Sequence, residues 1–227
     1  MKKLIALLIA VIMTISLVGC AGGPELLGKY ECTIDLYDTF ISSFDDSAEA
    51  GSISMKDYLD KFEVKVIFEF KEDGTYTQQI DMEFMNASLD NVTAALVPWM
   101  DAVMMDVFVT QLGAYGYTIE TKEDVEEILG YSWDTLYTQS YGMSAEEVAA
   151  SIVEASFEDV FKENELSEGN YKAKDGKLYT SASLDEAYSE TAYEIYEIDG
   201  DIVTITEGVN IEEDELLPYP VVLKKVA

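Results

Sequence analysis

The chain has 227 residues, and its 45 aspartate and glutamate residues outnumber its 14 lysines, which gives a formal net charge of −31. It contains no histidine and no arginine. These absences exclude Ser-His-Asp and Cys-His hydrolases, histidine-ligated metals and bidentate arginine clamps for phosphate, and the acidic charge disfavours nucleic acid as a partner. A hydrophobic content of 48% predicts a folded chain rather than disorder despite that charge.

The N-terminal residues have the composition of an export signal. Two lysines precede an apolar run from Leu4 to Met13, which is too short to span a membrane as a helix. Small residues follow, and then Leu17-Val18-Gly19-Cys20, which resembles the lipobox of bacterial lipoproteins. The resemblance implies that the signal is cleaved before Cys20 and that the thiol of this cysteine carries a lipid.

We therefore predict a signal peptide over residues 1–19 and a tether over residues 20–25. The lipid on Cys20 would hold the mature chain at the extracytoplasmic face of the cell membrane. A soluble secreted protein with a chance cysteine at its cleavage site is the alternative. With Cys20 acylated, Cys32 is the remaining thiol of the chain, so no intrachain disulfide is expected.

The first predicted strand follows the tether. In GKYECTID the residues Tyr30, Cys32 and Ile34 alternate with polar ones, so Cys32 shares the apolar face and is predicted to be buried and unreactive. The polar stretch SSFDDSAEAGSISMKDYLD that comes next is predicted as a loop with room for a helical turn or more.

A β-hairpin is predicted from FEVKVIFEF through KEDGTYTQQIDMEF. A two-residue turn would set the apolar face of one strand against a polar face of the next, whereas a three-residue loop over Glu72–Gly74 aligns the apolar faces. This loop requires Gly74 in the left-handed region, which glycine adopts without steric cost. The predicted pairs are Phe70 with Tyr76, Val66 with Ile80, Val64 with Met82 and Phe62 with Phe84.

From residue 86 to residue 164 the hydrophobic period changes to that of helices. Three helices are predicted: a long one with Pro98 as a kink or break, one from Thr121 to Gly130 that opens with a capping box, and one from Ser144 onward. The stretches between them, GAYGYTIE and YSWDTLYTQSYG, are expected to be exposed.

Alternating patterns return after residue 165. An Asp175-Gly176 hairpin is predicted without a settled register, and a third hairpin lies in YEIYEIDGDIVTITE. A loop over Ile198–Gly200 would pair Ile195 with Val203 and Tyr193 with Ile205, and would set Glu197 opposite Asp201. The stretch LPYPVVLKKV is predicted to close the sheet as its last strand.

The predicted organisation is one discontinuous antiparallel β domain, residues 26–85 and 165–227, interrupted by a helical insertion over residues 86–164. Neither β half has enough strands to cover its own apolar face, so both are predicted to form one barrel or strongly curved sheet in an α+β fold. The segments LLGKYEC, FEFKEDGTYT, YEIDGDIVTI and VVLKK resemble the lipocalin-like barrels of bacterial lipoproteins, although Tyr30 stands where lipocalins have tryptophan. The resemblance implies a barrel.

Aromatic residues in the insertion are the candidate ligand-binding side chains. Hydroxylated rings and an indole between helices suit an apolar ligand or a sugar face. The candidates are Tyr115, Tyr117, Tyr131, Trp133, Tyr137 and Tyr141.

A second hypothesis concerns Glu197, Asp199 and Asp201, which surround Gly200. Carboxylate oxygens suit calcium, so these residues are a candidate cation site, although a plain hairpin tip is the favoured interpretation. No catalytic residue is predicted, because adjacent carboxylates are expected by chance in a chain this acidic.

The sequence therefore predicts a non-enzymatic, membrane-anchored module without cofactor that binds a small apolar or amphiphilic ligand. Two alternatives remain. The first is a structural or interaction lipoprotein that docks an envelope protein through its acidic surface. The second is a carboxylate-based hydrolase of envelope glycans.

Overall fold

The computed structural model describes residues 26–48, 53–163, 166–211 and 219–226. The chain divides into two compact units. The first, here called the helical unit, comprises Tyr37–Phe62 and Ala87–Glu158; the second, the β unit, holds Glu63–Asn86 and the described residues before Tyr37 and after Glu158. Residues 37–48 and 53–62 thus belong to the helical unit, although the sequence interpretation placed them in the β domain.

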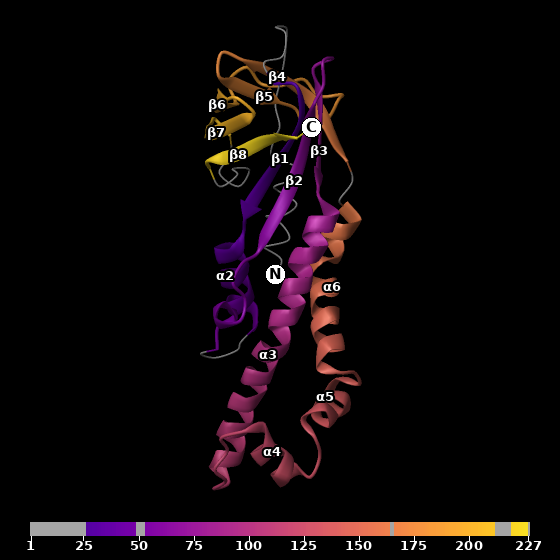
Figure 1. The fold of residues 1–227 in the computed structure, drawn as a ribbon, viewed down its shortest axis with the longest axis vertical. Coiled ribbons are helices and arrows are strands. Elements are labelled where there is room, and N and C mark those ends of the chain that lie inside the picture. The colour runs from indigo at the N-terminus through magenta and orange to yellow at the C-terminus, as the bar shows by residue number, and fades with distance from the viewer. Residues whose placement is uncertain (1–25, 49–52, 164–165, 212–218, 227) are drawn as a thin grey trace. The chain divides into compact units, whose positions relative to one another are not determined.

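In the described residues, eight antiparallel strands form a closed barrel in chain order (Figure 1). Pairing of Lys29 with Val226 joins the first strand to the last and closes the barrel. The predicted antiparallel barrel in an α+β fold is therefore confirmed. The strands are β1 (Gly28–Asp35), β2 (Glu63–Phe70), β3 (Thr75–Ile80), β4 (Ser167–Lys174), β5 (Lys177–Thr180), β6 (Tyr193–Asp199), β7 (Ile202–Val209) and β8 (Val221–Val226).

The interior of the barrel is packed with large side chains. The ring of Phe70 lies 4.9 Å from that of Tyr171 and 6.1 Å from that of Tyr76, measured between centroids. Side chains that are almost completely inaccessible to solvent leave no room for water beside them, as in an ordinary protein core. Buried side chains that are at most 4% exposed include Phe68, Phe70, Tyr76, Tyr171, Leu178, Tyr196, Ile205 and Leu223.

The first hairpin has the predicted loop. Phe70 pairs with Tyr76 and Val66 with Ile80, and Gly74 is left-handed with φ 81°. The two outer predicted pairs, Val64 with Met82 and Phe62 with Phe84, are wrong, because a helix begins at Met82. Its start is set by Asp81, whose carboxylate accepts a hydrogen bond of 3.1 Å from the backbone of Phe84 and ends the strand.

The third hairpin does not have the predicted register. Asp199 pairs with Ile202, so the turn is Gly200-Asp201, and Glu197 lies opposite Thr204 rather than Asp201. A bulge between Ile195 and Tyr196 shifts the remaining pairs. The two-residue turn shifts the register by an odd number of residues from the predicted one, so the other face of β6 points to the core: Glu194 and Tyr196 are buried, not Tyr193 and Ile195.

The second hairpin, whose register the sequence left open, has the two-residue turn Asp175-Gly176 between the paired Lys174 and Lys177. Both turn residues have positive φ, 53° and 72°. That combination matches the right-handed twist of the flanking strands.

The helices are α2 (Tyr37–Ala48), the 3-10 helix η1 (Met55–Asp57), α3 (Met82–Ala114), α4 (Lys122–Leu129), α5 (Trp133–Tyr141) and α6 (Ala145–Glu163). Figure 1 shows α4 and α5 linking the end of α3 to the start of α6. The capping box at Thr121 and the left-handed Gly130 that ends α4 are confirmed. Pro98 does not break α3, which runs through it as one helix.

Two helices were missed from the sequence. Helix α2 forms where a loop with room for a helical turn or more was predicted, since Phe40 and Phe44 recur at helical spacing, stack at 5.7 Å and are both buried. Phe44 also meets the ring of Trp99 edge-on at 5.0 Å. Helix α5 forms between the predicted helices, where the side chain of Ser132 accepts a hydrogen bond from the backbone of Thr135 as an N-cap.

Candidate functional site

The carboxylate of Asp101, in the middle of α3, binds side chains from α4 and α5. Its Oδ1 accepts hydrogen bonds from Nε1 of Trp133 at 2.7 Å and from the hydroxyl of Tyr137 at 3.0 Å. Its Oδ2 lies 2.5 Å from Nζ of Lys122, and that ammonium also lies 5.1 Å from the centroid of the Trp133 ring. One carboxylate therefore provides the hydrogen-bond acceptor for the indole N–H and the phenol hydroxyl and the counter-charge for the ammonium group, each of which would be costly to bury without a partner.

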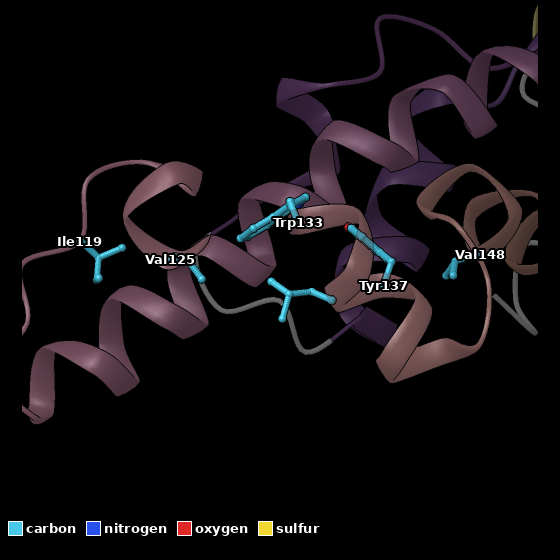
Figure 2. Packing of buried hydrophobic residues seen from close by; sticks show 6 residues of the cluster. Ile119, Val125, Trp133, Tyr137 and Val148 are labelled. Carbon is cyan, nitrogen blue, oxygen red and sulfur yellow. The ribbon is translucent and has the colours of Figure 1, made fainter. Parts of the chain in front are cut away.

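This network lies over a small hydrophobic cluster. Figure 2 shows Trp133 and Tyr137 of α5 together with Ile119, Val125 and Val148, which come from the neighbouring segments of the helical unit. The Trp133 ring also meets that of Phe108 edge-on at 5.9 Å. Burial first, and then the charge of Asp101, raise the pKa of the Tyr137 phenol, so its hydroxyl stays protonated and keeps donating its hydrogen bond.

Beside the cluster lies an apolar groove of about 440 Å³, here called the α3 groove. Its α3 wall is a stripe at helical spacing, and α5 and α6 supply the rest. Val107 remains 43% exposed and the Tyr141 ring is exposed, so the groove opens to solvent. Its lining is Trp99, Met100, Val103, Met104, Val107, Phe108, Gln111, Tyr137, Tyr141, Val148 and Ile152.

Helix α3 is long and apolar enough to cross a membrane by length and composition, and 22% of that apolar stretch is buried. Core helices of soluble proteins pass the same test. Here Asp101 interrupts the apolar stretch and its carboxylate contacts side chains of α4 and α5. These helices pack against α3, so the apolar residues on that side of α3 belong to the core of the helical unit. The uncovered remainder of the stripe forms the α3 groove.

The structure does not bring the six candidate aromatic residues together. Tyr137 and Tyr141 line the α3 groove, and Trp133 is buried behind it against Phe108. The expectation of exposure was therefore wrong for Trp133 and Tyr137, because α5 turns both into the cluster. The remaining three candidates are exposed and are not part of the groove lining: Tyr115, Tyr117 and Tyr131.

The residues that form most of the groove wall lie on α3 and were not among the sequence candidates. Met100, Met104 and Val107 belong to one apolar stripe of α3. The sequence signal that could have identified them is the breadth of the apolar stripe, because one neighbouring helix cannot cover a stripe this broad and part of it must stay uncovered.

A second hollow of about 490 Å³ also lies in the helical unit. Its wall mixes the charged Asp60 and Lys61 with small side chains of α3 such as Ala94 and Ala95. It lacks the thioethers and the continuous apolar wall of the α3 groove, so it is the weaker candidate for an apolar ligand.

A buried carboxyl group lies in the β unit. Glu194 is 3% exposed, and its Oε1 accepts a hydrogen bond of 2.9 Å from the hydroxyl of Tyr219. Within the described part of the chain, its Oε2 has no partner. Burial raises the pKa of this carboxyl to about 7, against the lowering effect of the Tyr219 hydrogen bond. The packed surroundings make Glu194 a buried polar group of the core rather than a site open to substrate.

The remaining sequence hypotheses receive no new support. Glu197, Asp199 and Asp201 are exposed on the β6–β7 hairpin, and no group of three or more potential metal ligands forms in the described ranges. Cys20 lies outside the described residues. Cys32 is buried, as predicted, and burial raises the pKa of its thiol to about 11, which keeps it protonated.

Comparisons of the chain with protein-family models, with curated proteins and with solved structures found no match.

Proposed function

We propose that this protein is an extracytoplasmic lipoprotein, anchored through Cys20, whose helical unit binds a small apolar or amphiphilic molecule in the α3 groove. The observation that carries the proposal is the groove itself. Its volume of about 440 Å³ lies within the range of roughly 300–1,000 Å³ that is typical of small-molecule sites. Apolar side chains make up nearly all of its lining.

The walls of the groove combine a fixed part with an adaptable part. Tyr137 is held by its hydrogen bond to Asp101, so that side of the groove is organised before a ligand arrives. Met100 and Met104 are the adaptable part of the wall, because their flexible thioether side chains adjust to ligands of different shape. Such a site suits a class of apolar chains rather than a single rigid molecule.

The packed interior of the barrel directs the proposal to the helical unit. Phe68, Phe70 and Tyr76 are each at most 2% exposed, and a ligand would have to displace rings of this kind to enter the barrel. The α3 groove requires no such displacement, because Val107 and Tyr141 already reach its open side. The chain also has no histidine or arginine for the usual catalytic sites, which agrees with a binding role.

Two valines of α3 make a matched test. Val107 lines the groove, whereas Val109 does not, and both are 43% exposed. The mature chain would be titrated with the neutral fluorescent probe N-phenyl-1-naphthylamine, whose emission rises in an apolar site. We expect Val107→Asp to weaken binding by about tenfold or more, because it buries a carboxylate against the ligand, and Val109→Asp to leave binding unchanged. Absence of probe binding to the unmodified chain, or equal effects of the two variants, would refute the proposal.

A further inference from the structure

The segment that carries the α3 groove is strongly acidic. Between residues 87 and 158 the sequence carries thirteen carboxylates and a single lysine. That lysine, Lys122, is engaged by the carboxylate of Asp101 and lies over the ring of Trp133. In this part of the helical unit an anionic head group would therefore meet carboxylates without a cation to pair with, at a cost in electrostatic free energy.

Two of these carboxylates act directly on the groove wall. Asp101 on α3 accepts a hydrogen bond of 3.0 Å from the hydroxyl of Tyr137, which lines the groove, and after burial the charges of Asp101 and then of Glu146 on α6 raise the pKa of this phenol. Tyr141 lines the same side, with its ring centroid 6.0 Å from that of Tyr137 and its own ring exposed. The exposed ring of Tyr141 attracts a cation through its quadrupole, and the excess of carboxylates in this segment adds to that attraction.

We infer that the ligand of the α3 groove is a single-chain amphiphile with a cationic head group. Its alkyl chain lies along Met100, Met104 and Val107, and its head lies at the Tyr141 side within the field of Glu146. This inference rests on the proposed function and adds the charge of the ligand to it.

The test compares three amphiphiles that share a dodecyl chain and differ in head-group charge: dodecyltrimethylammonium, dodecyl maltoside and dodecyl sulfate. Each is titrated below its critical micelle concentration against the full mature chain loaded with N-phenyl-1-naphthylamine, and displacement of the probe reports occupancy of the groove. We expect the cationic amphiphile to displace the probe at a concentration about tenfold lower than the neutral one, with the sulfate weakest. Raising the ionic strength should shrink these differences.

A pair of variants on α6 separates the local field from the overall charge. Glu146→Gln should weaken the cationic amphiphile about threefold and leave dodecyl maltoside unchanged, since it removes one nearby charge. Glu154→Gln removes the same charge from an exposed position of the same helix, and it should have a smaller effect on the cationic amphiphile.

The outcomes separate this inference from the proposed function. If all three amphiphiles displace the probe equally, or if the sulfate is the tightest, the groove binds apolar chains but the cationic assignment is wrong. If none displaces the probe and the probe itself does not bind, the proposed function fails as well. Equal effects of Glu146→Gln and Glu154→Gln would also overturn the inference, because the attraction would then come from the net charge of the protein.

Discussion

The indole Nε1 of Trp133 donates a hydrogen bond of 2.7 Å to Oδ1 of Asp101 and so connects α5 to the middle of α3. The same oxygen accepts from Tyr137, and Lys122 pairs with the other carboxylate oxygen. A single side chain thus connects α3 to α4 and α5 and fixes one wall of the α3 groove.

Removing that carboxylate should destabilise the protein strongly. Asp101→Ala leaves the donors of Trp133 and Tyr137 without their acceptor, and we expect a loss of about 3 kcal/mol in the free energy of unfolding. Asp101→Asn retains an acceptor and should cost about 1 kcal/mol, mostly from the lost ion pair with Lys122. Urea unfolding followed by tryptophan fluorescence measures both. The exposed Asp106 of the same helix is the control: Asp106→Ala should stay within about 0.5 kcal/mol, and equal losses for both alanine variants would contradict the assigned role.

Glu194 should make the stability of the fold fall as the pH rises. Its pKa is raised from 4.5 to about 7 in the folded chain, so the folded state holds the proton more tightly than the unfolded state. The stability from this group is fully present below about pH 4.5 and is lost as the pH rises to about 7. We expect Glu194→Gln to match the unmodified protein at pH 4.5 and to exceed its free energy of unfolding at pH 8 by on the order of 3 kcal/mol.

The measurement is the difference between the two chemical unfolding curves at each pH, because the other carboxylates then cancel. Tyr219→Phe serves as a control, since loss of its hydrogen bond to Oε1 should raise the pKa of Glu194 further and extend the decline to higher pH. A constant difference between the Glu194→Gln and unmodified chains at all pH values would show that the buried carboxyl does not titrate in this range.

Gly169 and Gly113 differ in the space available for a Cβ atom. A Cβ on Gly169 would lie 2.0 Å from the carbonyl oxygen of Ser181 and 2.7 Å from the ring of Tyr76. Gly169→Ala should therefore cost about 3 kcal/mol or more, because a strand must move apart from its neighbour. Gly113, in α3, has open space around its Cβ position, and Gly113→Ala should stabilise the helix by about 0.5–1 kcal/mol. Thermal unfolding of both variants compares them directly, and a tolerated Gly169→Ala would contradict the close approach of these strands.

Cys32 should react with thiol reagents only when the protein unfolds. The thiol is buried and its pKa is raised to about 11, so at pH 8 little thiolate forms and none of it is accessible. With the signal removed and Cys20 replaced by serine, Cys32 is the single thiol of the chain. We expect the Ellman reagent to label it slowly in buffer and at once in concentrated urea. Rapid labelling of the folded chain would show that the β1 region opens more readily than the barrel suggests.

Where local pattern and turn chemistry agree, the sequence predicted the structure in detail. The alternation of Val66 and Phe70 with polar residues and the left-handed Gly74 together specify the β2–β3 register, since a shift of one residue would bury the polar face. The same reasoning failed at the β6–β7 hairpin, because the turn is the two-residue Gly200-Asp201 and the shifted register turns the face with Glu194 to the core. The hydroxyl of Tyr219, which donates a hydrogen bond to this carboxyl, comes from a distant part of the chain, so no local pattern reports the burial.

The helical unit shows the same division. The capping residues Thr121 and Gly130 were enough to predict α4, the hydrophobic periods predicted the antiparallel β domain and the helical insertion, and the composition gave the acidic charge. Which apolar residues are core and which line a groove was decided only by the tertiary structure. Met104 and Val107 both belong to the apolar stripe of α3, yet Met104 is partly buried against the hydrophobic cluster whereas Val107 is 43% exposed at the groove. Hydrophobicity says that a side chain favours burial, whereas the partner that buries it depends on residues distant in the chain.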